Sequence, residues 1–252
     1  RRVPRDGCYP LSPTLDSIGT LAPDVASCAL VDAVLAGEDA PVCEPLPIAG
    51  LRLGVPQTFV LEGLDPEVAS AFARALSRLS EAGARVVDVP FPELAEVARI
   101  QRKGGFSVPE AYAQHRALIA AREAEFDPRV ASRILRGRGL EVAEYLEVVK
   151  ERGAFIAAGE RRALEFDALL MPAVAIVPPP IAELEASDEA YFKANARALR
   201  NTNVVNLLDG CALSIPCHGP GQPPVGLMVA GTAMRDRVVL AAGLAVERAL
   251  AR

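Results

Sequence analysis

The sequence contains no tryptophan, and aromatic residues make up only 5% of its 252 residues. Its core must therefore be packed mainly from alanine, leucine and valine, within a hydrophobic content of 51%. The two histidines lie far apart, and the five cysteines show no closely spaced pair. A metal site needs several such ligands in register, so we expect neither a metal nor another cofactor.

Long hydrophobic runs and an excess of positive charge are also missing. No apolar run reaches the ~18 residues of a transmembrane helix. The net charge is −5, with acidic and basic residues interspersed, which argues against a surface for nucleic acids or anionic membranes. An odd number of cysteines indicates reduced thiols. We therefore expect a cytoplasmic protein that binds neither membranes nor nucleic acids.

Short runs typical of strands alternate with helix signals, which indicates an α/β fold. Asp65-Pro66-Glu67 is a strong helix start, and Gly83 ends that helix. With a strand on either side, this helix forms one βαβ crossover, whose strands should be parallel. The predicted strands are 51–55, 84–89, 166–172, 212–215 and 225–229, and the last two are predicted to be adjacent and buried.

The length is compatible with one large domain or two small ones, and we expect a single domain over residues 1–252. Residues 93–165 show a helical pattern that is broken at Gly104-Gly105, at Asp127-Pro128 and around 137–139. We treat this stretch as a helical insertion. Its many charges at helical spacing are typical of solvated helix faces. Further helices are predicted after Asp24, from Asp188 toward Asn201, and over 235–251.

Two segments far apart in the chain carry recognisable motifs. The N-terminal text RVPRDGCYPLSPTLDSIGTLA matches a G-R-V-x-x-x-G-x-x-P-L-S-P-S-L-D-x-x-G-P-L-A pattern, with Thr14 for Ser and Thr20 for Pro. About two hundred residues later, R-N-T-x-x-x-N precedes an A-L-S-I-P-C strand and a P-x-G-L-M strand. In this order, the two motifs resemble the amidase signature family. Asp209-Gly210-Cys211 departs from the usual G-x-P of the family.

The resemblance implies a mixed, largely buried β-sheet flanked by helices, of which this chain would form the C-terminal part. Family members hydrolyse amides with a serine nucleophile, a second serine and a lysine, which lie in a G-G-S-S-G-G-S type of segment and its surroundings. None of these motifs occurs here, and Lys103, Lys150 and Lys193 fall on predicted helices. We therefore expect this chain alone to be inactive, and to pair with the upstream half of the same domain.

The resemblance and the residues together nominate a substrate-binding set. Asn201, Thr202, Asn203 and Asn206 form a polar cluster before a buried segment, and buried amides need partners. Thr202 and Asn206 could equally line a pocket or cap a helix, whereas Asn201 fits a structural network better. The candidate residues for binding a small amide substrate are Thr202, Asn203, Asn206 and His115, with no catalytic residue in the chain.

Other interpretations stay open from the sequence. Cys217-His218 is a weak candidate dyad, because neighbouring residues at a strand end tend to point to opposite sides. Ser12, between two prolines, suits a turn better than a nucleophile. The alternatives to an amidohydrolase are a non-catalytic α/β interaction module and a component of an amidotransferase, and a homodimer is compatible with each. The coding frame upstream of Arg1 would separate the enzyme from the independent module.

Overall fold

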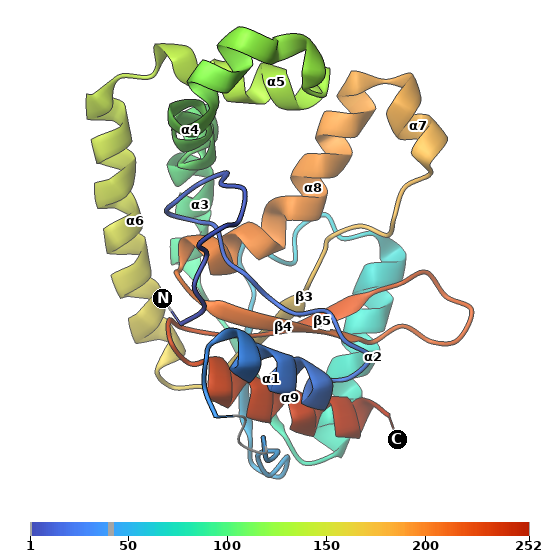
Figure 1. Ribbon diagram of the computed structural model, residues 1–252. Coiled ribbons are helices and arrows are strands. Elements are labelled where there is room, and N and C mark those ends of the chain that lie inside the picture. The colour runs from blue at the N-terminus through green and yellow to red at the C-terminus, as the bar shows by residue number, and fades with distance from the viewer. Residues whose placement is uncertain (1, 40–42, 252) are drawn as a thin grey trace.

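A mixed β-sheet lies at the centre of the computed structural model, which describes residues 2–39 and 43–251 (Figure 1). The strand order is β2-β1-β3-β5-β4. Strand β1 is parallel to β2 and β3, whereas β5 is antiparallel to β3 and β4. The predicted mixed sheet flanked by helices is confirmed. The strands are Arg52–Pro56 (β1), Arg85–Val89 (β2), Ala168–Pro172 (β3), Cys211–Pro216 (β4) and Gly226–Gly231 (β5).

The predicted βαβ unit consists of β1, α2 (Pro66–Glu81) and β2, and its two strands are parallel. Asp65 precedes the helix as predicted, but its carboxylate makes no capping hydrogen bond. It accepts instead from the backbone N–H of Val177, at 3.1 Å, and from the guanidinium of Arg197, at 2.7 Å. The acidic group at this helix start therefore ties α2 to two later segments of the chain.

Strands β4 and β5 are adjacent and antiparallel, as predicted. Strand β5 lies between β3 and β4, and its central residues are buried. The expectation of a buried strand is wrong for β4, in which Ile215 alone is fully buried. Side chains alternate between the two faces of a strand, and only one face of this edge strand is packed against α9 (Asp236–Leu250). Its other side chains, Ala212 and Ser214 among them, are exposed.

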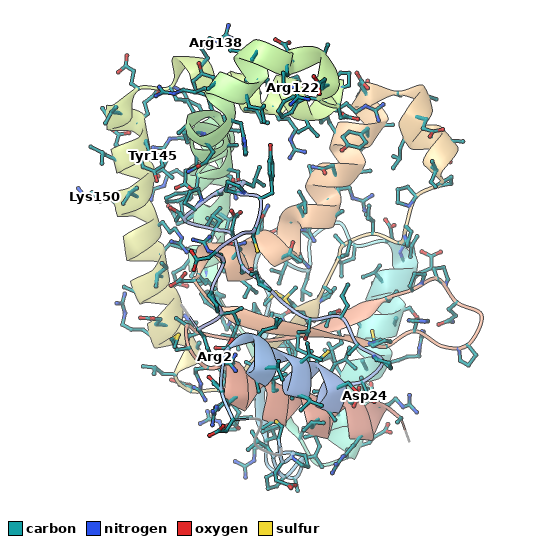
Figure 2. All side chains as sticks on the ribbon, viewed as in Figure 1. Arg2, Asp24, Arg122, Arg138, Tyr145 and Lys150 are labelled. Carbon is teal, nitrogen blue, oxygen red and sulfur yellow. The ribbon has the colours of Figure 1, made fainter. Side chains whose placement is uncertain are left out.

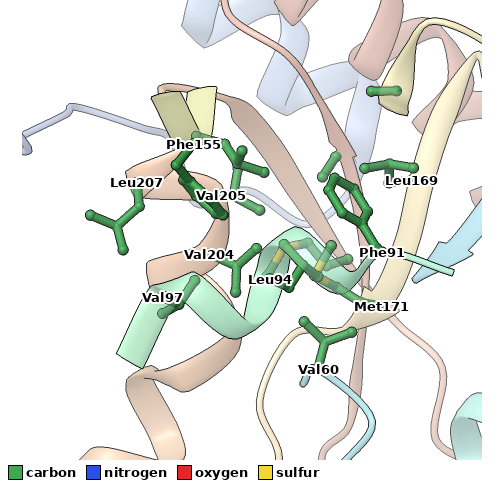
Figure 3. Close-up of a cluster of buried hydrophobic side chains, with 14 of the residues drawn as sticks. Val60, Phe91, Leu94, Val97, Phe155, Leu169, Met171, Val204, Val205 and Leu207 are labelled. Atoms are coloured by element: carbon green, nitrogen blue, oxygen red, sulfur yellow. The ribbon is translucent and has the colours of Figure 1, made fainter. Parts of the chain in front are cut away.

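Helices cover both faces of the central strands. Every residue of β3 is buried, and its side chains alternate between two hydrophobic clusters. Leu169 and Met171 pack with Phe91, Leu94 and Val204 on one face (Figure 3). Ala168 and Leu170 join residues of α2 and α9 on the other face. A strand buried on both sides has a continuous apolar sequence, as this one does.

The chain is largely helical between β2 and β3, close to the predicted range 93–165. The breaks at Gly105, Asp127 and Gly137 fall where the sequence indicates them. Helices α4 and α5 lie at the end of the molecule remote from the sheet (Figure 1). The elements are Pro92–Ala95 (η1), Glu96–Ile100 (α3), Arg102–Gly104 (η2), Ser107–Arg122 (α4), Glu123–Glu125 (η3), Pro128–Leu135 (α5), Arg136–Gly139 (η4) and Val142–Ala163 (α6).

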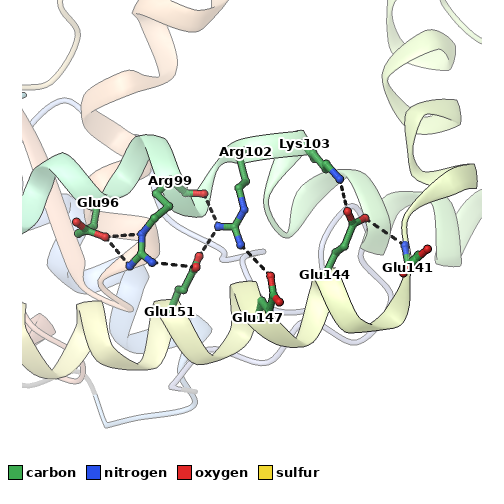
Figure 4. A network of polar contacts seen from close by, with 8 residues as sticks. All are labelled: Glu96, Arg99, Arg102, Lys103, Glu141, Glu144, Glu147 and Glu151. Atoms are coloured by element: carbon green, nitrogen blue, oxygen red, sulfur yellow. Dashed lines mark hydrogen bonds and ion pairs between the residues drawn. The ribbon is translucent and has the colours of Figure 1, made fainter.

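The charged face of α6 pairs with α3 and η2 rather than with water alone (Figure 4). Glu151 accepts from Arg99, at 3.0 Å, and from Arg102, and Glu144 accepts from Lys103. Exposed ion pairs of this kind contribute roughly 0–1 kcal/mol each, so the network fixes orientation more than it stabilises the fold. The charge spacing predicts a solvated helix face. The structure shows that this face also contacts the preceding helices, which the charge spacing alone does not predict.

Helix α8 (Asp188–Leu207) is longer than predicted and runs well past Asn201. Ser187 caps its start by accepting the N–H of Ala190. The polar cluster of residues 201–206 thus lies inside the helix, so the interpretation of these side chains as helix caps is wrong. A 3.6-residue repeat carries nearby polar positions onto different faces, where they meet different surroundings.

Two helices pack together beneath the sheet, near its β4 edge (Figure 1). They are α1 (Val25–Leu35), capped by Asp24 as predicted, and α9. The short helix α7 (Ile181–Ala186) precedes α8 and packs against it. Among the residues that the structure describes, no helix has both the length and the apolar character needed to cross a membrane.

Candidate functional site

A cleft of about 970 Å³ lies between the N-terminal segment, defined here as residues 5–18, and helices α4, α5 and α8. Many side chains extend from these helices into the space between them (Figure 2). Pockets for small molecules have volumes in this range. The cleft brings together the two motif-bearing parts of the sequence, the N-terminal segment and the α8 cluster. Its lining includes Tyr9, Ser12, Ala111, Arg133, Ile134, Leu199, Asn203 and Asn206.

The buried carboxylate of Glu110, in α4, holds the N-terminal segment in place. It accepts from the hydroxyl of Ser12, at 2.6 Å, and from both the hydroxyl and the backbone N–H of Thr14, at 2.5 and 2.9 Å. The phenol of Tyr145, in α6, donates to the same carboxylate at 2.6 Å. One side chain therefore ties the N-terminal segment to two helices of the 93–165 region.

These four donors favour the ionised form of Glu110. Burial raises the pKa of Glu110, but the hydrogen bonds from Ser12, Thr14 and Tyr145 outweigh burial and hold the pKa below its usual value. Burial and the bond to Glu110 raise the pKa of the Tyr145 phenol. The hydroxyl proton of Ser12 is committed to Glu110, which agrees with the structural role that its position between two prolines predicts.

The turn around Ser12 is also fixed from within the segment. The carboxylate of Asp16 accepts the backbone N–H groups of Leu11 and Ser12, each at 2.9 Å. Arg5 donates to the carbonyl oxygens of Pro13 and Asp16, both at 2.9 Å. A loop without helix or strand is thus held rigidly enough to serve as a cleft wall.

On the opposite wall, α8 presents Asn203 and Asn206 to the cleft. The side-chain amide of Asn206 donates to the carbonyl of Leu15 at 3.2 Å, so it links the two walls. The half-buried side chain of Asn203 has no hydrogen-bond partner within residues 2–39 and 43–251, and its amide is available to a ligand. Of the nominated α8 residues, Asn203 is thus placed best for contacting a substrate.

The neighbouring positions on α8 face elsewhere. Thr202 is exposed, does not line the cleft, and donates to the carbonyl of Leu199 at 3.0 Å. Asn201 is completely buried and donates to the carbonyls of Val60 and Pro172, at 3.0 and 2.7 Å. Asn201 thus has the structural role that the sequence favours, whereas a substrate contact of Thr202 stays a prediction.

His115 lies on α4 behind the N-terminal segment and is 5% exposed. Its Nε2 lies 2.5 Å from the carbonyl of Pro10, and its Nδ1 lies 3.2 Å from the phenol oxygen of Tyr9. Both ring nitrogens are therefore occupied by the protein. That His115 binds substrate stays a prediction, and the contacts seen here make it a support of the cleft wall.

Arg133, on α5, is the unexpected residue of the cleft. It is half-buried, it lines the cleft, and it has neither a hydrogen bond nor an ion pair with any residue in the described part of the chain. Guanidinium groups bind carboxylates with two parallel hydrogen bonds. An unneutralised Arg133 therefore favours an anionic group in the cleft.

The remaining nucleophile candidates are poorly suited to chemistry. Burial raises the pKa of the Cys217 thiol to about 11 and that of Cys211 to about 12, so neither forms a thiolate readily. The Nδ1 of His218 accepts the N–H of Val225 at 3.2 Å. No group of three or more potential metal ligands was found among the described residues.

Three residues that shape this site carry no distinctive signal in the sequence. Glu110 resembles any acid at a helix start, Tyr145 is one position of a charged helix, and Arg133 looks like a surface arginine. The one sequence signal for Glu110 is indirect. Ser12 and Thr14 carry hydroxyls next to prolines in a motif, and buried hydroxyls need a hydrogen-bond acceptor. No local pattern distinguishes Arg133 from the other arginines of the chain.

The chain is similar to known proteins over nearly its whole length. A family model described as Amidase matches residues 1–240. The chain is 34% identical to the 2-amino-5-chloromuconic acid deaminase of Comamonas testosteroni, over 98% of this chain and 54% of that protein. It is 29% identical to an amidase of Pseudomonas putida, over 98% and 56%. It is also 29% identical to a glutamyl-tRNA(Gln) amidotransferase component of a Roseiflexus strain, over 98% and 57%.

Solved structures show the same fold. A crystal structure of an amidase superposes with a TM-score of 0.84 at 30% identity, covering 98% of this chain and 56% of the other. The chain spans about half the length of the curated relatives it matches.

Proposed function

The chain belongs to the amidase family, and from this premise we propose that it supplies the sheet core and part of the substrate pocket of an amidohydrolase. The reaction is hydrolysis of the C–N bond of a small amide or urea-derived substrate. The observation that carries the proposal is the cleft, whose walls are the two segments that bear the family motifs. Its free amide on Asn203 and its guanidinium on Arg133 can bind and orient a substrate.

The chemical step needs groups that this sequence does not contain. The family resemblance assigns the nucleophile and its base to a serine, a second serine and a lysine in a Gly/Ser-rich region, and a nucleophile without its base loses almost all of its rate. We place these groups in the remaining part of the domain. The role of this chain in the reaction is to hold the substrate, not to attack it.

Two surfaces fit that remaining part as a partner. The outer edge of β4 has no neighbouring strand among the described residues, and exposed strand edges present unpaired N–H and C=O groups. Next to it, α1 is apolar on both sides, and its outer side chains Leu30, Val31, Val34 and Leu35 are exposed. Since the curated relatives are almost twice as long as the matched region, we assign both surfaces to the rest of an amidase domain.

The unpaired Arg133 narrows the substrate class to amides or related amines that carry a carboxylate. One relative, at 34% identity, is by its name a deaminase of a chlorinated aminomuconic acid, which is a carboxylic acid with an amino group. A guanidinium that is half-buried and unneutralised supports the same kind of substrate here, because binding the carboxylate would give it the partner that it lacks.

Amidase assays test the proposal with two preparations. We expect the 252-residue chain alone to hydrolyse an activated anilide no faster than background and to leave its serines unmodified by a sulfonyl fluoride. The protein that contains the rest of the domain should hydrolyse a carboxylate-bearing amide. Turnover by the chain alone, together with stoichiometric sulfonylation of one serine, would contradict the assignment of roles.

A substitution of Arg133 tests the proposed substrate class in the same assay. In the complete protein, Arg133→Gln should raise KM for the carboxylate-bearing amide about tenfold or more, since charged hydrogen bonds contribute about 1.5–3 kcal/mol. The matched neutral amide is the control, and its KM should change little. Equal effects on both substrates would contradict a carboxylate contact.

A component of an amidotransferase is the second candidate, favoured by the 29% identity to one from a glutamyl-tRNA(Gln) amidotransferase. Glutamine itself carries a carboxylate and an amide, so the same cleft would suit it. Release of ammonia from glutamine, in preference to other amides, would select this alternative. A complete protein with no activity on any amide would favour the non-catalytic interaction module.

A further inference from the structure

Tyr9 exposes one face of a fixed aromatic ring to the cleft. It lines the cleft wall and is 71% exposed. Its ring stacks on the imidazole of His115, with centroids 4.7 Å apart and planes inclined by 12°. Because His115 is almost fully buried, the stacked face of Tyr9 is shielded, and the exposed area belongs to the opposite face and the ring edge.

Hydrogen bonds fix the orientation of this pair. The carbonyl of Pro10 can only accept, so the Nε2 of His115 carries the proton and donates to it at 2.5 Å. In the neutral imidazole the Nδ1 is then an acceptor, to which the phenol of Tyr9 donates at 3.2 Å. A ring held on one face and at its hydroxyl loses little further freedom when a ligand covers its other face.

From this geometry we infer that Tyr9 is a specificity-determining residue that stacks on a planar, conjugated part of the substrate. This inference rests on the proposed function and deepens it. Aromatic faces prefer offset stacking with another π-system over contact with a saturated chain of the same size. With Arg133 binding a carboxylate in the same cleft, the substrate class becomes a planar conjugated carboxylate that carries the amide or amino group.

Binding of two simple carboxylates to the complex of this chain with the rest of the domain tests the inference without any turnover, because neither compound carries an amide. Sorbate and hexanoate have the same carbon count and charge, but sorbate has a planar diene. Isothermal titration calorimetry should show tighter binding of sorbate, by about three- to tenfold, the range that aromatic pairs span. Equal affinities, or no binding of sorbate, overturn the inference.

Two substitutions at one position separate stacking from hydrogen bonding. Tyr9→Leu should abolish the preference for sorbate, whereas Tyr9→Phe should keep it, because the ring remains although the hydroxyl is lost. The melting temperature of the complex with Tyr9→Leu should stay close to that of the unmodified complex, since the side chain is mostly exposed. If Tyr9→Leu still prefers sorbate, another part of the cleft provides the preference, and the inference is overturned.

The outcomes for this inference and for the proposed function are distinguishable. Sorbate preference that depends on Tyr9, in a complete protein that hydrolyses no amide, supports the inference and contradicts the amidohydrolase. The complete protein could instead hydrolyse planar and saturated amides with equal kcat/KM, and Tyr9→Leu could leave kcat/KM unchanged. That result would contradict the inference and would still support the amidohydrolase.

Discussion

At the scale of single residues, Glu110 contributes most to holding the cleft wall together. Its carboxylate receives four hydrogen bonds from donors on the N-terminal segment and α6. Alanine at this position would remove the acceptor shared by all four donors, and a buried donor that loses its partner costs about 1–3 kcal/mol. The residue thus couples the stability of the fold to the shape of the site.

We expect Glu110→Ala to lower the free energy of unfolding by about 3–5 kcal/mol and Glu110→Gln by about 1–2 kcal/mol. Glutamine retains one acceptor for the N–H of Thr14, and the hydroxyls of Thr14 and Tyr145 can rotate to accept from its NH₂ group. Urea denaturation measures both values. Equal, small effects of the two substitutions would contradict the anchoring role.

The same residue predicts a pH dependence. The folded-state pKa of Glu110 is lowered, so its contribution is fully present above the unfolded-state value of about 4.3 and is lost as the pH falls toward the folded-state pKa. Between about pH 5 and pH 3, the unmodified chain should therefore lose more stability than Glu110→Gln, which cannot titrate. Parallel pH profiles for the two proteins would show that Glu110 makes no such contribution.

At the scale of secondary structure elements, Asn201 joins α8 to the chain beyond β1 and to the end of β3. Its buried amide donates to the carbonyls of Val60 and Pro172. This contact sets the position of the helix, and hence the position of Asn203 and Asn206 in the cleft wall. The adjacent Thr202 makes only a local bond within the helix.

We expect Asn201→Leu, which removes the amide and keeps a side chain of similar length, to destabilise the fold by about 2–3 kcal/mol. Thr202→Val is the matched control on the same helix, and it should change stability by no more than about 0.5 kcal/mol. Thermal unfolding followed by circular dichroism compares the two. A larger loss in Thr202→Val than in Asn201→Leu would refute the assigned roles.

At the scale of the whole molecule, the outer edge of β4 has no neighbouring strand among the described residues. The β4 edge and the outer face of α1 together present unpaired backbone groups and exposed apolar side chains. Such surfaces associate in water, because both hydrogen-bonding groups and apolar area gain partners. This property belongs to the assembly of elements and not to any one of them.

We expect the 252-residue chain expressed alone to bind a hydrophobic dye and to elute in size-exclusion chromatography as large or mixed species. Co-expression with the rest of an amidase domain should yield one soluble complex. Leu30→Lys with Val34→Lys should reduce self-association, whereas Ile181→Lys, an exposed position on α7, serves as the control. A stable homodimer would show that a second copy of the chain covers the β4 edge and α1. A monodisperse monomer that binds no dye would favour an independent module.

The sequence by itself determined the local elements and the family. Helix starts, glycine breaks and apolar runs depend on interactions within a few residues, so the βαβ unit, the 93–165 helices and strand β3 were predictable. Two motifs about two hundred residues apart were specific enough to identify the amidase family and a mixed sheet. The structural roles of Ser12 and Asn201 also followed from their surroundings in the sequence.

Tertiary structure alone decided which polar residues meet. Glu110 and Ser12 are 98 positions apart, and no local rule pairs them. The four polar positions of α8 look alike in the sequence, yet helix rotation buries Asn201, exposes Thr202 and turns Asn203 and Asn206 to the cleft. Whether β4 is buried depends on its neighbours in the sheet. Long-range packing sets each of these outcomes, because contact between distant segments depends on the whole fold and not on the periodicity of either segment.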